Sequence, residues 1–158
     1  RLNSLIISFD GPDLGDDVEV FTLFPDSDGA TQDWTLSSGS DGFSLIDTPG
    51  FEDPPTDVIE AATVGDISEF GAAALGQTIF SVETVFTRVY AQKDAAASAE
   101  MRIDLEYNGT YYNGPSDFAL NTDYGFFENQ LDTNPATGAA WLPSEIGNID
   151  GFRIERTA

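Results

Sequence analysis

Carboxylates dominate the side chains in this sequence that could take part in chemistry. The chain has 28 Asp and Glu residues against six Lys and Arg residues, and it contains no His and no Cys. Thiolate nucleophiles, histidine general bases and nearly all zinc sites are therefore excluded. The remaining possibilities are calcium binding, glycoside cleavage by carboxylates, and binding of a sugar or a protein surface without catalysis.

Two acidic turns have the ligand types that calcium prefers. Asp26, Asp28 and Asp33 surround Gly29, and four more aspartates occur within residues 10–17. The EF-hand spacing fails, because Gly29 comes too early and no Glu stands at the twelfth position. Acidic turns are commonly just solvated. We therefore expect no cofactor, with calcium at Asp26, Asp28 and Asp33 as the alternative.

Glycoside cleavage needs two carboxylates about 5–9.5 Å apart, one of them with a raised pKa. The acids on or beside expected strands are Glu83, Glu100, Asp104 and Glu106. The last three alternate with apolar residues, so they are explained as outward residues of a half-solvated strand. The sequence names no catalytic pair. It favours a non-enzymatic protein, with a glycan-cleaving enzyme as the least favoured alternative.

Aromatic residues close to asparagine are candidates for binding carbohydrate without catalysis. The candidates are Tyr111, Tyr112, Asn113, Phe126 and Phe127. Aromatic residues in strands more often belong to a core. Adjacent residues of a strand point to opposite faces, so we expect one member of each aromatic pair to lie outside.

The elements that must position these residues are short strands. Residues 100–107 alternate between charged and apolar side chains, residues 85–92 alternate as well, and Asn108-Gly109 is typical of a hairpin turn. Further strands are expected at 18–24, 111–112, 117–120, 124–131 and 151–157, with short extended pieces around 34–36 and 43–46. This pattern predicts a single all-β domain over residues 1–158, an antiparallel sandwich of jelly-roll type with minimal helix.

Several segments are expected to connect the strands. Residues 25–30 have the composition of a turn, and residues 47–57 that of a loop. Residues 65–77 form at most one helical turn, and residues 143–146 are expected to start another, with Ser144 near the N-cap. Residues 132–141, DTNPATGAAW, predict a turn whose small residues leave room for Trp141 to pack against the sandwich.

The order of motifs carries a family resemblance. The motifs are Pro25-Asp26, Asp28-Gly29, Trp34, Arg88, Tyr90, Lys93-Asp94, Asn108-Gly109-Thr110, Tyr112-Asn113-Gly114 and Asn134–Trp141. In this order and spacing the chain resembles, over roughly residues 20–158, small virion structural proteins of tailed bacteriophages. The resemblance implies a lectin-like (concanavalin-type) jelly roll and a place on the particle surface.

The resemblance also implies a function and partners. It points to a non-enzymatic capsid decoration or cement subunit that binds the major capsid protein or another virion protein. Copies of such a subunit are expected to contact one another around capsid symmetry axes, as a homo-oligomer. The alternative is a carbohydrate-binding jelly-roll module associated with a tail or fibre.

An apolar run at the start of the chain supplies the candidate contacts with the particle. It contains Leu2, Leu5, Ile6, Ile7 and Phe9, and it is too apolar for a free tail. Residues 1–17 are accordingly expected to be an N-terminal arm that binds the partner. The equal alternative is that this run is the first strand of the sandwich itself.

The net charge of −22 restricts the partners further. Binding to nucleic acid or to an anionic membrane needs clustered Lys and Arg, so both are disfavoured. A chain with this charge repels itself unless salt screens it. The sequence therefore suggests either a saline setting, marine or halophilic, or simply an acidic, soluble surface.

Overall fold

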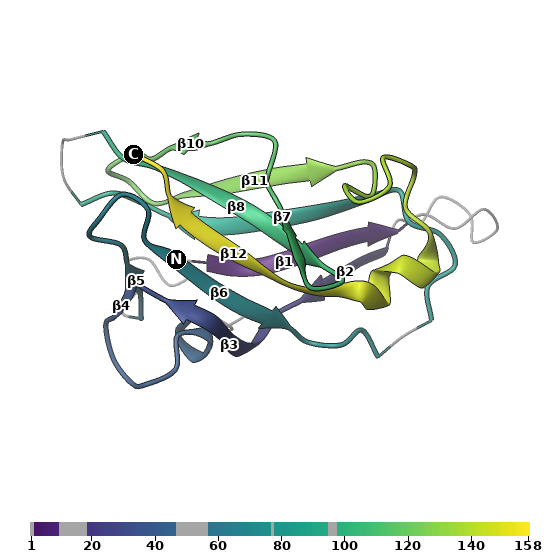
Figure 1. Ribbon diagram of the computed structural model, residues 1–158, viewed down its shortest axis with the longest axis horizontal. Coiled ribbons are helices and arrows are strands. Elements are labelled where there is room, and N and C mark those ends of the chain that lie inside the picture. The colour runs from purple at the N-terminus through teal and green to yellow at the C-terminus, as the bar shows by residue number, and fades with distance from the viewer. Residues whose placement is uncertain (1, 10–18, 47–56, 77, 95–97) are drawn as a thin grey trace.

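Two antiparallel sheets packed face to face make up the protein (Figure 1). The computed structural model describes residues 2–9, 19–46, 57–76, 78–94 and 98–158, and for residues 2–9, 19 and 20 it describes the backbone alone. The strands are β1 (Leu2–Phe9), β2 (Glu19–Leu23), β3 (Pro25–Gln32), β4 (Thr35–Leu36), β5 (Ile59–Glu60), β6 (Ile67–Ala72), β7 (Thr84–Ala91), β8 (Glu100–Tyr107), β9 (Thr110–Tyr112), β10 (Phe118–Ala119), β11 (Gly125–Leu131) and β12 (Ile149–Arg156). Two short 3-10 helices complete the elements, η1 (Phe43–Leu45) and η2 (Pro143–Asn148).

The strand order defines the two layers. The first sheet has the order β11-β7-β1-β2, and the second has the order β10-β8-β12-β6-β3, with β9 also paired to β8. A separate small sheet joins β4 to β5. The predicted all-β antiparallel sandwich is confirmed. This order does not establish jelly-roll connectivity, which stays a prediction.

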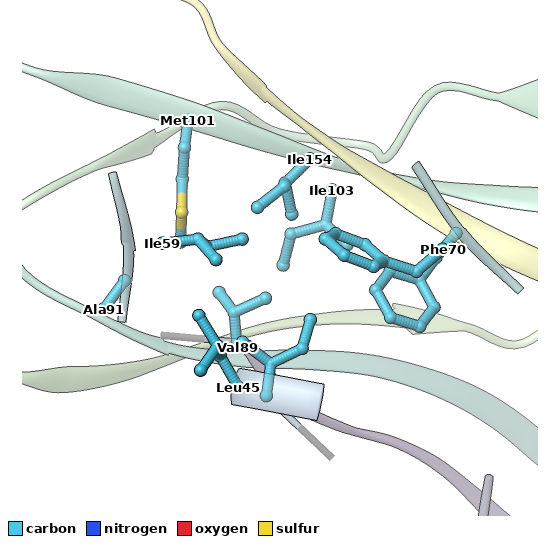
Figure 2. Packing of buried hydrophobic residues seen from close by; sticks show 10 residues of the cluster. Leu45, Ile59, Phe70, Val89, Ala91, Met101, Ile103 and Ile154 are labelled. Atoms are coloured by element: carbon cyan, nitrogen blue, oxygen red, sulfur yellow. The ribbon is translucent and has the colours of Figure 1, made fainter. Parts of the chain in front are cut away.

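The core lies between the sheets and follows the alternation seen in the sequence. Val85 and Val89 of β7 face Ile103 and Leu105 of β8, and all four are at most 1% exposed. Figure 2 shows Val89 and Ala91 of β7 and Leu45 of η1 in one cluster with Ile103, Ile154 and Phe70 of the six-stranded sheet. Burying one such side chain contributes roughly 1.5–3 kcal/mol. This closed core holds the outer faces of both sheets in fixed positions.

The apolar N-terminal run forms β1, a central strand of the four-stranded sheet. It pairs with β2 on one edge, as in Ile7 opposite Phe21, and with β7 on the other, as in Ile6 opposite Phe86. Of the two interpretations of this run, an arm or a strand, the structure therefore has the strand: the run is the first strand of the sandwich. The contacts of the side chains of Leu2, Leu5, Ile6, Ile7 and Phe9 lie outside the described residues, so their partner-binding role remains a prediction.

The prediction of a turn at residues 25–30 is wrong, because this segment belongs to the edge strand β3. Pro25 occupies the first strand position, where the missing amide costs no ladder hydrogen bond. Register shifts at both ends of the pairing with β6 absorb the turn-forming residues. Gly29 fits because a Cβ there would lie 2.5 Å from Glu69 Cβ. The close approach of β3 to β6 therefore requires a glycine at position 29.

Two more expectations of local structure are wrong. Residues 67–72 form β6 instead of a helical turn, since pairing with β3 and β12 on both sides outweighs local helix preference. The Phe70 ring packs against Phe152 of β12 in a tilted arrangement, with centroids 5.5 Å apart. Residues 43–45 form η1 instead of an extended piece. The Asp28 carboxylate accepts hydrogen bonds there from the amides of Gly42 (2.8 Å) and Phe43 (2.7 Å).

The loop at residues 132–141 seats Trp141 as predicted. The Asn134 side-chain oxygen accepts a hydrogen bond from the Ala136 amide at 2.9 Å, and Gly138 adopts a φ of 70°. The Trp141 indole is 3% exposed and donates to the Leu131 carbonyl at 2.8 Å. The role of the loop is therefore structural: it places Trp141 in the core.

The short helix after this loop begins within the expected segment, but its N-cap lies two residues before Ser144. It begins at Pro143, and Glu145 accepts a hydrogen bond from the Leu142 amide at 2.8 Å. Leu142 and not Ser144 is therefore at the N-cap position. A proline preorganised for the first helical position explains the difference.

Candidate functional site

The carbohydrate-binding candidates divide between the two sheets. Each adjacent pair splits as expected: Tyr112 and Phe127 pack against the core, while Tyr111 and Phe126 lie outside it. Tyr111 belongs to β9 of the six-stranded sheet and Phe126 to β11 of the four-stranded sheet. Asn113 is exposed beyond β9. These residues therefore do not form one site.

Phe126 belongs instead to a group of rings on the outer face of the four-stranded sheet. Phe126 lies directly opposite Tyr90 of β7, with ring centroids 4.8 Å apart. Tyr124 stacks on the same Tyr90 at 5.1 Å. We call Tyr90, Tyr124 and Phe126 the aromatic row. Its members come from two strands and a loop, so their contact depends on a strand register that sequence reasoning could not supply.

An ion pair borders the aromatic row. The Arg88 guanidinium lies 5.6 Å from the Phe126 centroid, and its Nε donates to Glu128 at 2.7 Å. Phe126 remains 49% exposed. A large ring presented to solvent beside a neutralised cation is a typical composition for a contact surface.

The outer face of the six-stranded sheet is a network of ion pairs. Asp104, predicted to be a solvated outward residue, points outward but is 0% exposed. Its carboxylate accepts hydrogen bonds from Arg102 Nε (2.9 Å), Arg153 Nε (2.7 Å) and the Gly114 amide (3.1 Å). Two cations and a loop amide therefore replace water around it. A carboxylate held this way fastens the loop at Gly114 to β8.

Glu106 is the acid that comes closest to the expectation for catalysis. Burial raises the pKa of Glu106, a hydrogen bond from Tyr111 lowers it, and Asp150 and Glu69 raise it further. The pKa of Tyr111 is also raised, by burial and then by the nearby Glu106. Neither Glu106 nor Glu69 lines the cavity described below. We therefore assign no catalytic residue.

The three aspartates that are calcium candidates all accept hydrogen bonds from other groups of the protein. The Asp28 carboxylate holds η1, and Asp33 Oδ2 accepts a hydrogen bond from the Ile67 amide at 3.2 Å. Asp26 accepts from the Ser27 hydroxyl at 3.0 Å. Within the described ranges no group of three or more acidic side chains is arranged to hold a metal ion. The acidic cluster in residues 10–17 lies outside those ranges.

A cavity of about 500 Å³ opens at one end of the sandwich. It lies where β7 and β12 end, where β8 and β11 begin, and beside the β4–β5 pair. Trp34, Tyr124 and Leu120 supply apolar walls, while Lys93 and Glu100 supply charges. No sequence pattern predicts this site. Lys93-Asp94 belongs to the motifs of the family resemblance, which give these two residues no role.

No family model, curated protein or solved structure matches this chain. In the part of the chain that the structure describes, no helix is long and apolar enough to cross a membrane.

Proposed function

We propose that this chain is a non-enzymatic structural protein of a virion, a decoration or cement subunit that adheres to the capsid shell. The observation that carries the proposal is the aromatic row on the outer face of β7 and β11. Adhesion requires a preorganised surface that a partner can dehydrate, and it requires no reacting groups.

The aromatic row has the properties of such a surface. Its three rings contact one another through Tyr90, so their positions are set before a partner arrives. Rigid aromatic side chains lose little conformational entropy on binding, and interface hot spots are enriched in Tyr and Arg. Arg88 adds a cation whose charge Glu128 already balances. A partner that covers this face would therefore remove apolar area from water without burying an unpaired charge, because Arg88 is already paired with Glu128.

The charge of the rest of the molecule supports the same surface. With 28 acidic and six basic residues, most of the exterior must be negative. Two of the arginines, Arg102 and Arg153, are already engaged with Asp104 on the opposite sheet. The acidic faces keep copies soluble and apart, and the row supplies the attachment.

The N-terminal run keeps a supporting role in this proposal. Both edges of β1 are paired, with β2 and with β7, so its backbone offers no free edge to a partner. β1 is the neighbour that fixes the position of β7, on which Tyr90 and Arg88 stand. Its own side chains remain predicted contacts.

Co-sedimentation with virus particles stripped of this protein tests the proposal. Phe126→Ala should weaken attachment about tenfold or more, the loss expected when an interface aromatic worth about 1.4 kcal/mol is removed. Phe80→Ala is the matched control, because Phe80 is 77% exposed but stands apart from the aromatic row.

The outcomes separate specific attachment from general hydrophobicity. Loss for Phe126→Ala alone supports the proposal. Equal loss for both variants, or a wild-type chain that does not sediment with the particles, contradicts it. Circular dichroism of both variants must match the wild type, which is expected because both side chains are exposed.

A further inference from the structure

The cavity at the end of the sandwich combines rings with charges of both signs. Trp34 and Tyr124 form part of its wall, and the charged lining residues are Glu60, Lys93, Asp94, Glu100 and Arg156. Its volume of about 500 Å³ falls within the roughly 300–1,000 Å³ of small-molecule sites. We propose that this cavity binds the end of a neutral oligosaccharide, as a mono- or disaccharide unit.

The aromatic walls are held in place before any ligand binds. The Trp34 indole donates to the Asp66 carbonyl at 3.1 Å, which fixes its plane against the core. Tyr124 is held by stacking on Tyr90. The C–H faces of a sugar ring are apolar and pack on aromatic rings of this kind, while Tyr retains a polar tip.

The rim of the cavity is tied together by backbone hydrogen bonds. Lys93 donates its amide to the Asn121 carbonyl at 2.8 Å, and Leu120 donates to Ala99 at 2.9 Å. Arg156 Nη1 donates to the Ala62 carbonyl at 2.7 Å, joining the β5 side of the cavity to the end of β12. Arg156 therefore acts as a positioning residue. A preformed rim reduces the entropy that a ligand must overcome.

The polar groups match hydroxyls better than they match an ion. Lys93 forms no ion pair with any carboxylate among the described residues, so its ammonium keeps donors for a ligand. Asp94 and Glu100 also line the cavity and offer acceptors. A hydroxyl both donates and accepts, and a sugar carries several, so it satisfies donors and acceptors together.

The balance of charge favours a neutral ligand over an ion. The lining contains three carboxylates, from Glu60, Asp94 and Glu100, against the two cations Lys93 and Arg156. An anion would face the carboxylates, and a cation would face Lys93 and Arg156. A neutral ligand avoids both repulsions and uses both kinds of group.

Titration calorimetry with cellobiose, maltose, lactose and chitobiose, beside sialyllactose as an acidic comparator, tests the inference. The variants are Tyr124→Ala, to remove the ring, and Glu100→Gln, to change an acceptor. Each should weaken binding of a neutral sugar about tenfold, and Tyr124→Phe should retain it. The matched controls are Phe80→Ala and Glu83→Gln, whose side chains are exposed and lie outside the cavity.

The results separate this inference from the adhesion proposal. Neutral-sugar binding that is lost in Glu100→Gln and kept in Glu83→Gln supports the inference. Failure of every neutral sugar to bind, or equal binding by wild type and cavity variants, overturns it. Binding of sialyllactose alone, abolished by Lys93→Met, also overturns it in favour of an anion site. Glu100 is not part of the aromatic row. The Glu100→Gln variant should therefore attach to particles as the wild type does, whether or not the protein binds a sugar.

Discussion

Single residues on the six-stranded sheet show how neighbours set the behaviour of an acid. Asp104 and Glu106 stand two positions apart on β8, where alternation alone predicts that both are solvated. Asp104 is enclosed by Arg102 and Arg153, which neutralise it. Glu106 has Tyr111 as its hydrogen-bond donor, with Asp150 and Glu69 nearby. On the same face of β8, the charge of Asp104 is therefore balanced by two arginines, while burial disfavours the charged form of Glu106.

The raised pKa of Glu106 predicts a pH-dependent effect on stability. A folded-state pKa above the ordinary value means that Glu106 favours folding below about pH 4.5, and that this contribution is lost as pH rises through the folded pKa. Glu106→Gln should therefore raise the thermal unfolding midpoint at pH 7. The difference from wild type should disappear near pH 4.

Differential scanning calorimetry at the two pH values checks this prediction. Glu83→Gln is the control, because Glu83 is an exposed carboxylate beside β7 and should show little change at either pH. A Glu106→Gln variant that is less stable than wild type at pH 7 would show that the carboxylate has a favourable partner there.

At the scale of elements, turns and strand edges respond differently to their sequence. The hairpin at Asn108-Gly109 forms as predicted, with φ angles of 50° and 68°. The loop before Trp141 also forms as predicted, because Asn134 and Gly138 act within a few residues of each other. Residues 25–30 have similar composition but form an edge strand paired with β6. Local chemistry decides a turn only where no distant strand competes for the backbone.

Gly138 provides the test at this scale. Gly138→Ala forces a side chain into a φ of 70° and should destabilise the fold by about 1 kcal/mol. This corresponds to a fall of about 2–4 °C in the unfolding midpoint for a chain of this size. Gly147→Ala in η2 is the matched control, since a Cβ there meets nothing within 4 Å and the φ is not positive.

Chemical denaturation of the two glycine variants measures the difference. Equal losses of stability for Gly138→Ala and Gly147→Ala would mean that the positive φ is not what the loop requires of position 138.

For the whole molecule, electrostatic repulsion opposes the cohesion of the core. A net charge of −22 on 158 residues makes the folded state repel itself, while the apolar core between the sheets holds it together. Salt weakens the repulsion, because the screening length falls from about 10 Å at 0.1 M to about 3 Å at 1 M. The core is little affected by this screening.

Stability should therefore rise with ionic strength. We expect the thermal unfolding midpoint to increase steadily between about 0.05 and 1 M NaCl, and equally in KCl if screening is the cause. Calorimetry across both salts measures it. A midpoint that does not change with salt would remove the argument for a saline setting and leave the simpler interpretation, an acidic, soluble surface.

The sequence alone determined the fold class of this protein, the hairpin turn at Asn108-Gly109 and the loop before Trp141. Alternation in residues 85–92 and 100–107 assigns the inner face of each strand, because side chains of a strand repeat every two residues. Only the tertiary structure decided which faces meet. Tyr90, Tyr124 and Phe126 come together through the register of β7 and β11, and the cavity gathers Trp34, Lys93 and Glu100 from distant segments. Register and sheet packing depend on long-range pairing, which no local pattern encodes.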